Sequence, residues 1–275
     1  MTTEKKPEII EEAEVVVEGE RISRRRKGIY LLPNLLTTAA LFCGFYAILA
    51  GINGLYTSAA MAIFIAMILD GLDGRVARMT NTQSAFGAEY DSLSDLISFG
   101  LAPGLLMYTW SLHGFGQKGF VKEDFVAAFI YIVCAALRLA RFNTTVATAD
   151  KKFFQGLPSP AAAAVMVSTV WVCEKYGISG MSSVNFQFGM AILTIFTGLF
   201  MVSDLKFYSF KEFAVRDRVP FIVLVVIAIL FAVIYLKTAE VLFIFFFGYM
   251  LSGPTYWLFQ WRKNRLEKIN GSDNE

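Results

Sequence analysis

DGLDGRVARMTNTQSAFGAEYDSLSD, residues 70–95, sets four aspartates between two long apolar segments of the chain. Asp70 and Asp73 are three residues apart and Asp91 and Asp95 are four apart, so each pair projects from one face of a helix. Carboxylates at the ends of membrane helices are costly and are usually functional. Four of them facing across one helix pair cannot all stay ionised and unpaired, so we expect them to bind cations.

The ligand chemistry of this stretch indicates a hard metal ion. Carboxylates without histidine or cysteine nearby favour Mg²⁺, Mn²⁺ or Ca²⁺, and two ions could share the four acids. The single histidine, His113, is expected in a loop, and the three cysteines show no metal-ligand spacing. The acids are interleaved with small residues, namely Gly71, Gly74, Ala77, Ala85, Gly87 and Ala88. Small residues either pack helices closely or let a phosphate approach the backbone, and Arg78 is either a phosphate partner or a cytoplasmic anchor.

The composition of the chain is that of a helical membrane protein. Of its 275 residues 56% are hydrophobic and only 17% are charged, against about 25% in soluble domains. With a mean hydropathy of +0.53, this argues against a soluble or disordered chain. The net charge of +2 is too balanced for a general polyanion binder such as a nucleic-acid-binding protein.

Apolar runs near the ~20 residues needed to cross a bilayer predict an all-α polytopic membrane protein with eight spans. The expected spans are Leu35–Ile52, Ser58–Val76, Leu93–Leu112, Asp124–Phe142, Pro158–Val172, Phe186–Val202, Val219–Leu236 and Ala239–Leu258. Residues 1–30 are polar and basic and lack the apolar stretch of a signal peptide, so we interpret them as a cytosolic tail.

Lysine and arginine accumulate on the cytoplasmic side of short loops, which gives a test of the eight spans. With both termini on one side, 21 of the 25 cations lie on that side, and Lys118, Lys122, Lys175 and Lys237 lie opposite. A span missed or invented in mid-chain would exchange the sides of every later loop and destroy this asymmetry. We therefore expect both termini and the aspartates to face the cytoplasm. The membrane in which the protein resides is expected to be the cell (inner) membrane.

The aspartates belong to a longer pattern. It begins with DxxDGxxAR, has a G after eight further residues, and ends with two D residues, each preceded by three residues. This pattern resembles the motif of the CDP-alcohol phosphotransferases. The matching residues are Asp70, Asp73, Gly74, Ala77, Arg78, Gly87, Asp91 and Asp95. The resemblance implies a six-helix catalytic core over residues 31–203. The last two expected spans, as two extra transmembrane helices, and a basic cytosolic tail then occupy residues 204–275. The resemblance also implies a site with two Mg²⁺ or Mn²⁺ ions and a membrane-embedded, CDP-linked substrate.

The same resemblance implies roles for the motif residues. Asp70, Asp73 and Asp91 would be metal ligands, Asp95 would be the general base and could also contact metal, and Gly74, Ala77, Arg78 and Gly87 would line the CDP site. The chemistry agrees, because attack of an alcohol on a pyrophosphate needs divalent ions and a base near the hydroxyl. His113 falls on the opposite membrane face, so a carboxylate must be that base.

Other stretches are similar to the integral-membrane phosphatidylserine synthases within that family. They are LLPNLLTTAALFCGFYAI (31–48), SFGLAPG (98–104), ALRLARFN (136–143) and FFQGLPSPAAA (153–163), with Ala40 standing where some relatives have Asn. The implied substrates are CDP-diacylglycerol and L-serine, and the products are phosphatidylserine and CMP.

A serine site needs a cation for the carboxylate of the substrate. Arg138 and Arg141 are the candidates, and we favour Arg138 because it lies deeper in its span. Asn143 and Gln155 are either polar contacts of serine or loop residues. Pro158 and Pro160 are expected to shape the start of the fifth span.

Two alternative functions remain at this point. A related enzyme could use glycerol 3-phosphate or inositol phosphate, which would require further basic residues at the site. A cation- or proton-coupled transporter is a remote alternative, because its acids should lie near the middle of the bilayer. The sequence leaves a homodimer open, although we expect the Phe-rich stretch Phe243–Phe247 to face lipid.

Overall fold

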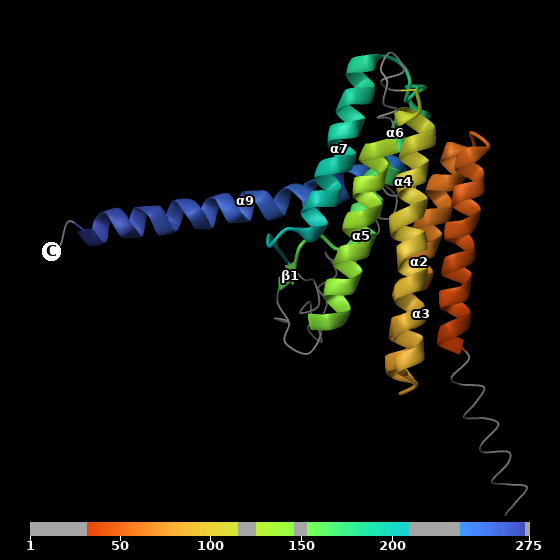
Figure 1. Ribbon diagram of the computed structural model, residues 1–275, viewed down its shortest axis with the longest axis horizontal. Coiled ribbons are helices and arrows are strands. Elements are labelled where there is room, and N and C mark those ends of the chain that lie inside the picture. Colours follow the sequence, from red (N-terminus) through yellow and green to blue (C-terminus); the bar gives the residue numbers. More distant parts are fainter. Residues whose placement is uncertain (1–31, 115–124, 146–152, 209–236, 273–275) are drawn as a thin grey trace, which may run out of the picture.

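The computed structural model describes residues 32–114, 125–145, 153–208 and 237–272, and most of them lie in helices (Figure 1). The helical elements are Leu32–Ile52, α2 (Tyr56–Met79), α3 (Ala85–Asp95), η1 (Leu96–Leu101), α4 (Ala102–Met107), η2 (Tyr108–Leu112), α5 (Val126–Thr145), α6 (Ser159–Lys175), α7 (Val184–Val202) and α9 (Thr238–Ser272). Two short strands, β1 (Phe153–Gln155) and β2 (Lys206–Tyr208), were not predicted. The expectation of a mostly helical chain is confirmed.

Seven of the eight expected spans coincide with helices, and the remaining one, Val219–Leu236, lies outside the described residues. Among the described residues, four helices are long and apolar enough to cross a membrane. They are Leu32–Ile52, Val126–Thr144, Val184–Val202 and Thr238–Arg265. These helices indicate an integral membrane protein, while the count of eight spans and their orientation stay predictions.

The helix that carries Asp91 and Asp95 begins earlier than the sequence predicts. Its N-cap is Ser84, whose side chain accepts a hydrogen bond from the backbone N–H of Gly87 at 3.0 Å. Helix α3 therefore starts eight residues before the expected Leu93, and both aspartates lie inside a helix. The run then continues without a break through η1, α4 and η2 to Leu112.

Two π-helical segments interrupt this long helical run, and the first follows directly after Asp95. Nearby, Pro103 has no N–H to give to the carbonyl of Phe99, four residues earlier. The buried hydroxyl of Tyr131 in α5 donates to that carbonyl at 2.9 Å instead. This hydrogen bond joins α5 to the helical run that begins with Asp91 and Asp95 in α3.

Helix α6 lies at the centre of the described helices. Its residues Ala161 to Val170 are buried, and α6 packs against α2, α4, α7 and α9. Four consecutive alanines, Ala161 to Ala164, allow these neighbours to approach closely, as small residues do in membrane proteins. The start of α6 is consequently held from several sides.

The two strands tie the chain before α6 to the chain after α7. They are antiparallel, with Phe154 opposite Phe207. Just beyond β1, Gly156 has φ +76° and lies so close to Met201 that an added Cβ would be 2.2 Å from the carbonyl oxygen of Met201. Only glycine meets both conditions without strain.

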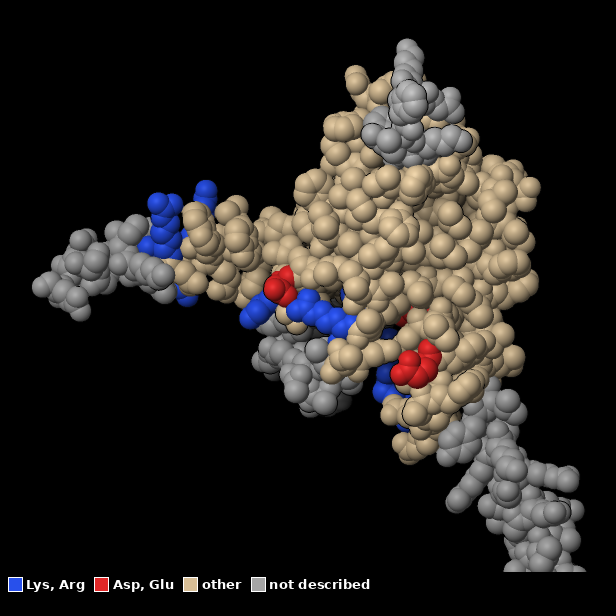
Figure 2. All heavy atoms as spheres, viewed as in Figure 1, with Lys and Arg blue, Asp and Glu red and all other residues tan. Residues whose placement is uncertain are grey.

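Charged side chains are unevenly distributed over the described surface. On the face shown in Figure 2 they lie in the lower part of the body and on the projecting end of α9, whereas the upper part of the body is uncharged. The picture shows one face only, and Lys175, Lys237 and Glu240 form ion pairs at the C-terminal end of α6.

Candidate active site

Three of the four aspartates come together between α2 and α3. Asp70, Asp91 and Asp95 each place a carboxylate oxygen within 4.8 Å of the other two. Asp91 and Asp95 lie one turn apart on α3, and Asp70 reaches them from the C-terminal half of α2. We call these three residues the carboxylate group.

The carboxylate group fits a divalent cation. Its members are half-buried, and Oδ1 of Asp91 is buried with no hydrogen-bond partner among the described residues. A buried carboxylate oxygen without a donor is costly, and a hard cation would satisfy it while neutralising the repulsion between the three acids. Mg²⁺ and Mn²⁺ prefer this type of ligand.

Asp73 lies outside the carboxylate group. Its Oδ2 accepts a hydrogen bond from the hydroxyl of Thr37 at 2.6 Å, and only 4% of the residue is exposed. Asp73 therefore faces the first helix, Leu32–Ile52. The sequence pointed to the LLPNLLTT stretch, but it did not single out Thr37 as a site residue.

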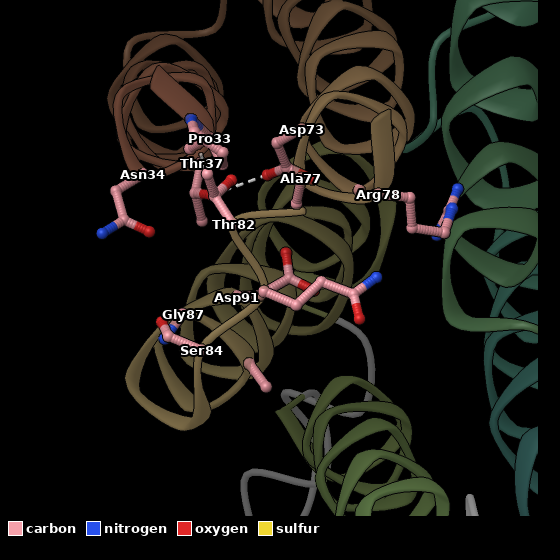
Figure 3. A pocket seen from close by; sticks show the side chains of 13 residues that line it. Pro33, Asn34, Thr37, Asp73, Ala77, Arg78, Thr82, Ser84, Gly87 and Asp91 are labelled. Atoms are coloured by element: carbon pink, nitrogen blue, oxygen red, sulfur yellow. Dashed lines mark hydrogen bonds between the residues drawn. The ribbon is translucent and has the colours of Figure 1, made fainter. Parts of the chain in front are cut away.

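A cavity of about 290 Å³ opens beside Asp73 and Asp91 (Figure 3). It is bounded by the start of the first helix, the end of α2, the connecting turn and the start of α3. Its lining residues are Pro33, Asn34, Thr37, Asp73, Gly74, Ala77, Arg78, Thr82, Gln83, Ser84, Gly87, Ala88 and Asp91. All four residues expected to line a CDP site are among them, whereas Asp70 and Asp95 are not.

The glycines of the cavity are not points of close helix packing. A Cβ added to Gly74 would meet only the Arg78 guanidinium, at 3.5 Å, among the described residues. A Cβ on Gly87 would meet side-chain oxygens of Ser84 and Asn34, at 3.1 and 3.5 Å. Within the described part of the chain, both glycines have only polar side-chain atoms near the missing Cβ and no backbone of another helix, which favours the interpretation that a ligand approaches them.

The cavity also contains residues that the sequence did not suggest. Asn34 and Thr37 are three residues apart on the first helix, and both face the cavity (Figure 3). Their spacing on one helical face was a usable signal, but nothing in the sequence showed that this helix lies against α2 and α3. Thr38 adds a contact there, with its hydroxyl 2.9 Å from that of Tyr90.

Arg138 and Arg141 have different surroundings. Arg141 donates to Asp204 Oδ1 at 2.7 Å and to the carbonyl of Val202 at 3.1 Å. Gln155 donates to the same Asp204 oxygen at 2.8 Å. The hydrogen bond from Arg141 has the larger effect and that from Gln155 the smaller, and together they hold the pKa of Asp204 below its usual range. Arg141 and Gln155 therefore join α5 and β1 to the end of α7.

Arg138 faces the acids. Its Nη1 donates to the hydroxyl of Ser159 at 2.6 Å, and it lies close enough to Asp95 for their charges to interact. Its guanidinium carbon is 5.9 Å from the centre of the Phe142 ring. Asn143, the other predicted polar contact, donates to Ser92 at 3.0 Å and joins α5 to α3. Ser159 is fully buried and was not singled out from the sequence.

A transferase class follows from comparison with known proteins. The chain belongs to the CDP-alcohol phosphatidyltransferase family, whose model matches residues 30–203. Helix α9 lies outside the matched residues.

Three named proteins illustrate the relatives to which this chain is similar. A protein of Helicobacter pylori strain J99, called CDP-diacylglycerol–serine O-phosphatidyltransferase, is 35% identical over 231 residues, which is 84% of this chain and 92% of the relative. A protein of the same name from Mycobacterium tuberculosis strain H37Rv is 30% identical over 86% of this chain and 81% of its own length. An archaetidylserine synthase of Methanothermobacter thermautotrophicus is 33% identical over 64% of this chain and 69% of its own length.

Proposed function

We propose that this protein is a CDP-diacylglycerol–serine O-phosphatidyltransferase. It moves the phosphatidyl group of CDP-diacylglycerol to the hydroxyl of L-serine and releases CMP. The observation that carries the proposal is the position of Asp91, which belongs both to the carboxylate group and to the lining of the cavity. A nucleotide in that cavity has its phosphates beside the acids. The names of the relatives support serine as the acceptor.

The cavity holds the CDP part of the donor. Gly74, Ala77 and Gly87 line it with small side chains or none, and Arg78 pairs with the pyrophosphate. The guanidinium of Arg78 lies over Gly74, so its charge and the exposed backbone act on the same part of the ligand. The lipid tails remain in the bilayer.

Asp70, Asp91 and Asp95 hold a divalent cation, Mg²⁺ or Mn²⁺. Asp73 lines the cavity, and the family resemblance implies that it would be a ligand of a second ion. Bound divalent ions neutralise charge on the phosphate oxygens and orient the donor for in-line attack.

Asp95 accepts the proton of the serine hydroxyl. The hydroxyl oxygen forms a bond to the phosphorus that carries diacylglycerol, and the bond from that phosphorus to the bridging oxygen of CMP breaks. The electron pair leaves with CMP, the proton moves to the Asp95 carboxylate, and phosphatidylserine is formed. Asp95 belongs to the carboxylate group but does not line the cavity, which supports a role for it on the acceptor rather than on the donor.

Arg138 binds the carboxylate of serine. It lies near Asp95, whereas Arg141 is already engaged by Asp204 and Val202. An acceptor with its own phosphate would need further cations here. The alternatives glycerol 3-phosphate and inositol phosphate are less well supported for this reason, and a transporter is not supported because the chain belongs to a family of transferases.

The catalytic core comprises residues 31–203, and residues 204–275 add the last two spans and a basic tail. Both termini and the active site face the cytoplasm, and the protein resides in the cell (inner) membrane. The distribution of lysine and arginine along the sequence supports this orientation.

Product analysis tests the proposal. The purified protein is given CDP-diacylglycerol and labelled L-serine with Mg²⁺ or Mn²⁺, and in parallel labelled glycerol 3-phosphate or inositol phosphate. We expect phosphatidylserine and CMP in equal amounts, with activity abolished by excess chelator. Product from a phosphorylated acceptor but none from serine would contradict the proposal.

A further inference from the structure

Helix α9 packs on α6 and β2, although it lies outside the residues that match the family. Figure 1 shows α9 crossing the other helices at a steep angle, with its C-terminal half projecting away from them. Its N-terminal end is anchored to the end of α6, where Lys175 donates to both carboxylate oxygens of Glu240 at 2.8 Å. The part of α9 between these regions packs on α6 and β2.

The contact between α9 and β2 is tight. Phe207, the central residue of β2, is fully buried. A Cβ added to Gly253 would lie 2.3 to 2.9 Å from three atoms of the Phe207 ring. The ring of Tyr249, one turn earlier on α9, lies 5.7 Å from the Phe207 ring, and its hydroxyl donates to the carbonyl of Tyr208 at 3.1 Å. Gly253 and Tyr249 therefore determine where β2 lies.

Strand β2 in turn holds the start of α6. Phe207 pairs with Phe154 of β1, and directly after β1 the N–H of Gly156 donates to the carbonyl of Leu205 at 2.9 Å. The next N–H, of Leu157, donates to the carbonyl of Phe200 at 2.9 Å. Two residues later, Ser159 begins α6 and accepts the hydrogen bond from Arg138.

We propose that α9 is a positioning element for the acceptor site: Gly253 and Tyr249 hold Phe207, and through β1 and Ser159 this contact sets the position of the Arg138 guanidinium. The inference rests on the proposed function, in which Arg138 binds serine. Tyr249 is itself close enough to Arg138 for electrostatic interaction, so α9 also reaches the surroundings of the guanidinium directly.

Gly253→Ala tests this connection, and Gly248→Ala is its matched control. Both glycines lie in α9, but an added Cβ at Gly248 meets no atom of the described residues within 4 Å. At Gly253 the buried Phe207 ring must move, and β2 must move with it. We expect Gly253→Ala to raise the KM for serine about tenfold, since small displacements of a binding group have large effects. The KM for CDP-diacylglycerol should stay within about twofold, and Gly248→Ala should change neither constant.

Rescue distinguishes positioning from a general loss of structure. Phe207→Leu introduced into Gly253→Ala provides room for the new methyl group and should lower the KM for serine again. Tyr249→Phe keeps the ring but removes its hydroxyl and with it the hydrogen bond to Tyr208, and it should also raise the KM for serine.

Three outcomes would overturn the inference: an unchanged KM for serine in Gly253→Ala and Tyr249→Phe, an equal rise in the KM of donor and serine, or no rescue by Phe207→Leu. A wild-type protein that makes no phosphatidylserine would instead refute the proposed function. The two failures are therefore distinguishable.

Discussion

At the scale of single residues, Asp91 belongs to both halves of the proposed site, the carboxylate group and the cavity lining. Asp91→Asn removes a charge from the carboxylate group and alters the cavity wall. We expect phosphatidylserine synthesis to fall by at least about 100-fold, together with weaker Mn²⁺ binding. Glu89→Gln removes an exposed acid from the same helix and should leave both unchanged. Normal Mn²⁺ binding by Asp91→Asn would exclude this residue as a ligand.

Asp95 is predicted to act on the acceptor more than on the donor. Asp95→Asn should lower kcat by about 10²–10⁴-fold, the usual contribution of a general base, and more if Asp95 also binds metal. Binding of CDP-diacylglycerol should largely survive, because Asp95 does not line the cavity. Steady-state kinetics with varied donor would show this. Lost donor affinity with normal turnover at saturation would contradict the assignment.

Arg138 and Arg141 should respond differently to the same change. Arg138→Lys keeps the charge but loses the planar guanidinium, so the KM for serine should rise at least about tenfold with little change for CDP-diacylglycerol. Arg141→Lys should mainly weaken the contact with Asp204 and leave the KM for serine nearly unchanged. A raised KM for serine in Arg141→Lys alone would reverse the assignment.

The distinction between these two arginines shows how far sequence reasoning reaches at the residue scale. The motif spacing pointed to four aspartates; the structure brings Asp70, Asp91 and Asp95 together, whereas Asp73 accepts a hydrogen bond from Thr37. The sequence could not distinguish Arg138 from Arg141 by their partners. Ser159, the partner of Arg138, and Asp204, the partner of Arg141, are distant in sequence, and their positions depend on tertiary packing. Thr37 was missed for the same reason.

At the scale of elements, the turn between β1 and α6 is predicted to depend on Gly156. Gly156→Ala places a methyl group against the carbonyl of Met201 at a positive φ. Gly177→Ala has a similar φ of +67° but no described atom within 4 Å of the new Cβ. We expect Gly177→Ala to cost about 1 kcal/mol and Gly156→Ala clearly more. Thermal unfolding in detergent measures both, and equal losses would show that the contact with Met201 is unimportant.

The hydropathy pattern predicted where the helices lie, but it predicted their ends and the segments that connect them less well. The third helix was placed from its apolar part, starting at Leu93, because the polar residues before it lower the hydropathy although Ser84 caps a longer helix. The strands β1 and β2 escaped prediction because three-residue strands leave no periodic pattern, and their pairing joins segments about fifty residues apart. The register depends on contacts that only the folded chain contains.

At the scale of the whole molecule, the orientation in the membrane is the main prediction. In a variant without Cys43, Cys134 and Cys173, Met181→Cys should react with an impermeant thiol reagent added to intact cells. Met181 is exposed and follows α6 in the connection that leads to α7. Arg262→Cys, near the other end of α9, should react only after the membrane is opened. Labelling of Arg262→Cys in intact cells would contradict cytoplasmic termini.

In the proposed function, the position of Asp91 at the boundary between the carboxylate group and the cavity would link the binding of cation and donor thermodynamically. If a bound cation tightens donor binding by some factor, the donor must tighten cation binding by the same factor. The apparent metal requirement of the enzyme is then not a constant. It falls as the membrane fills with CDP-diacylglycerol and rises as that lipid is consumed, so the supply of donor lipid sets how much free metal the protein needs.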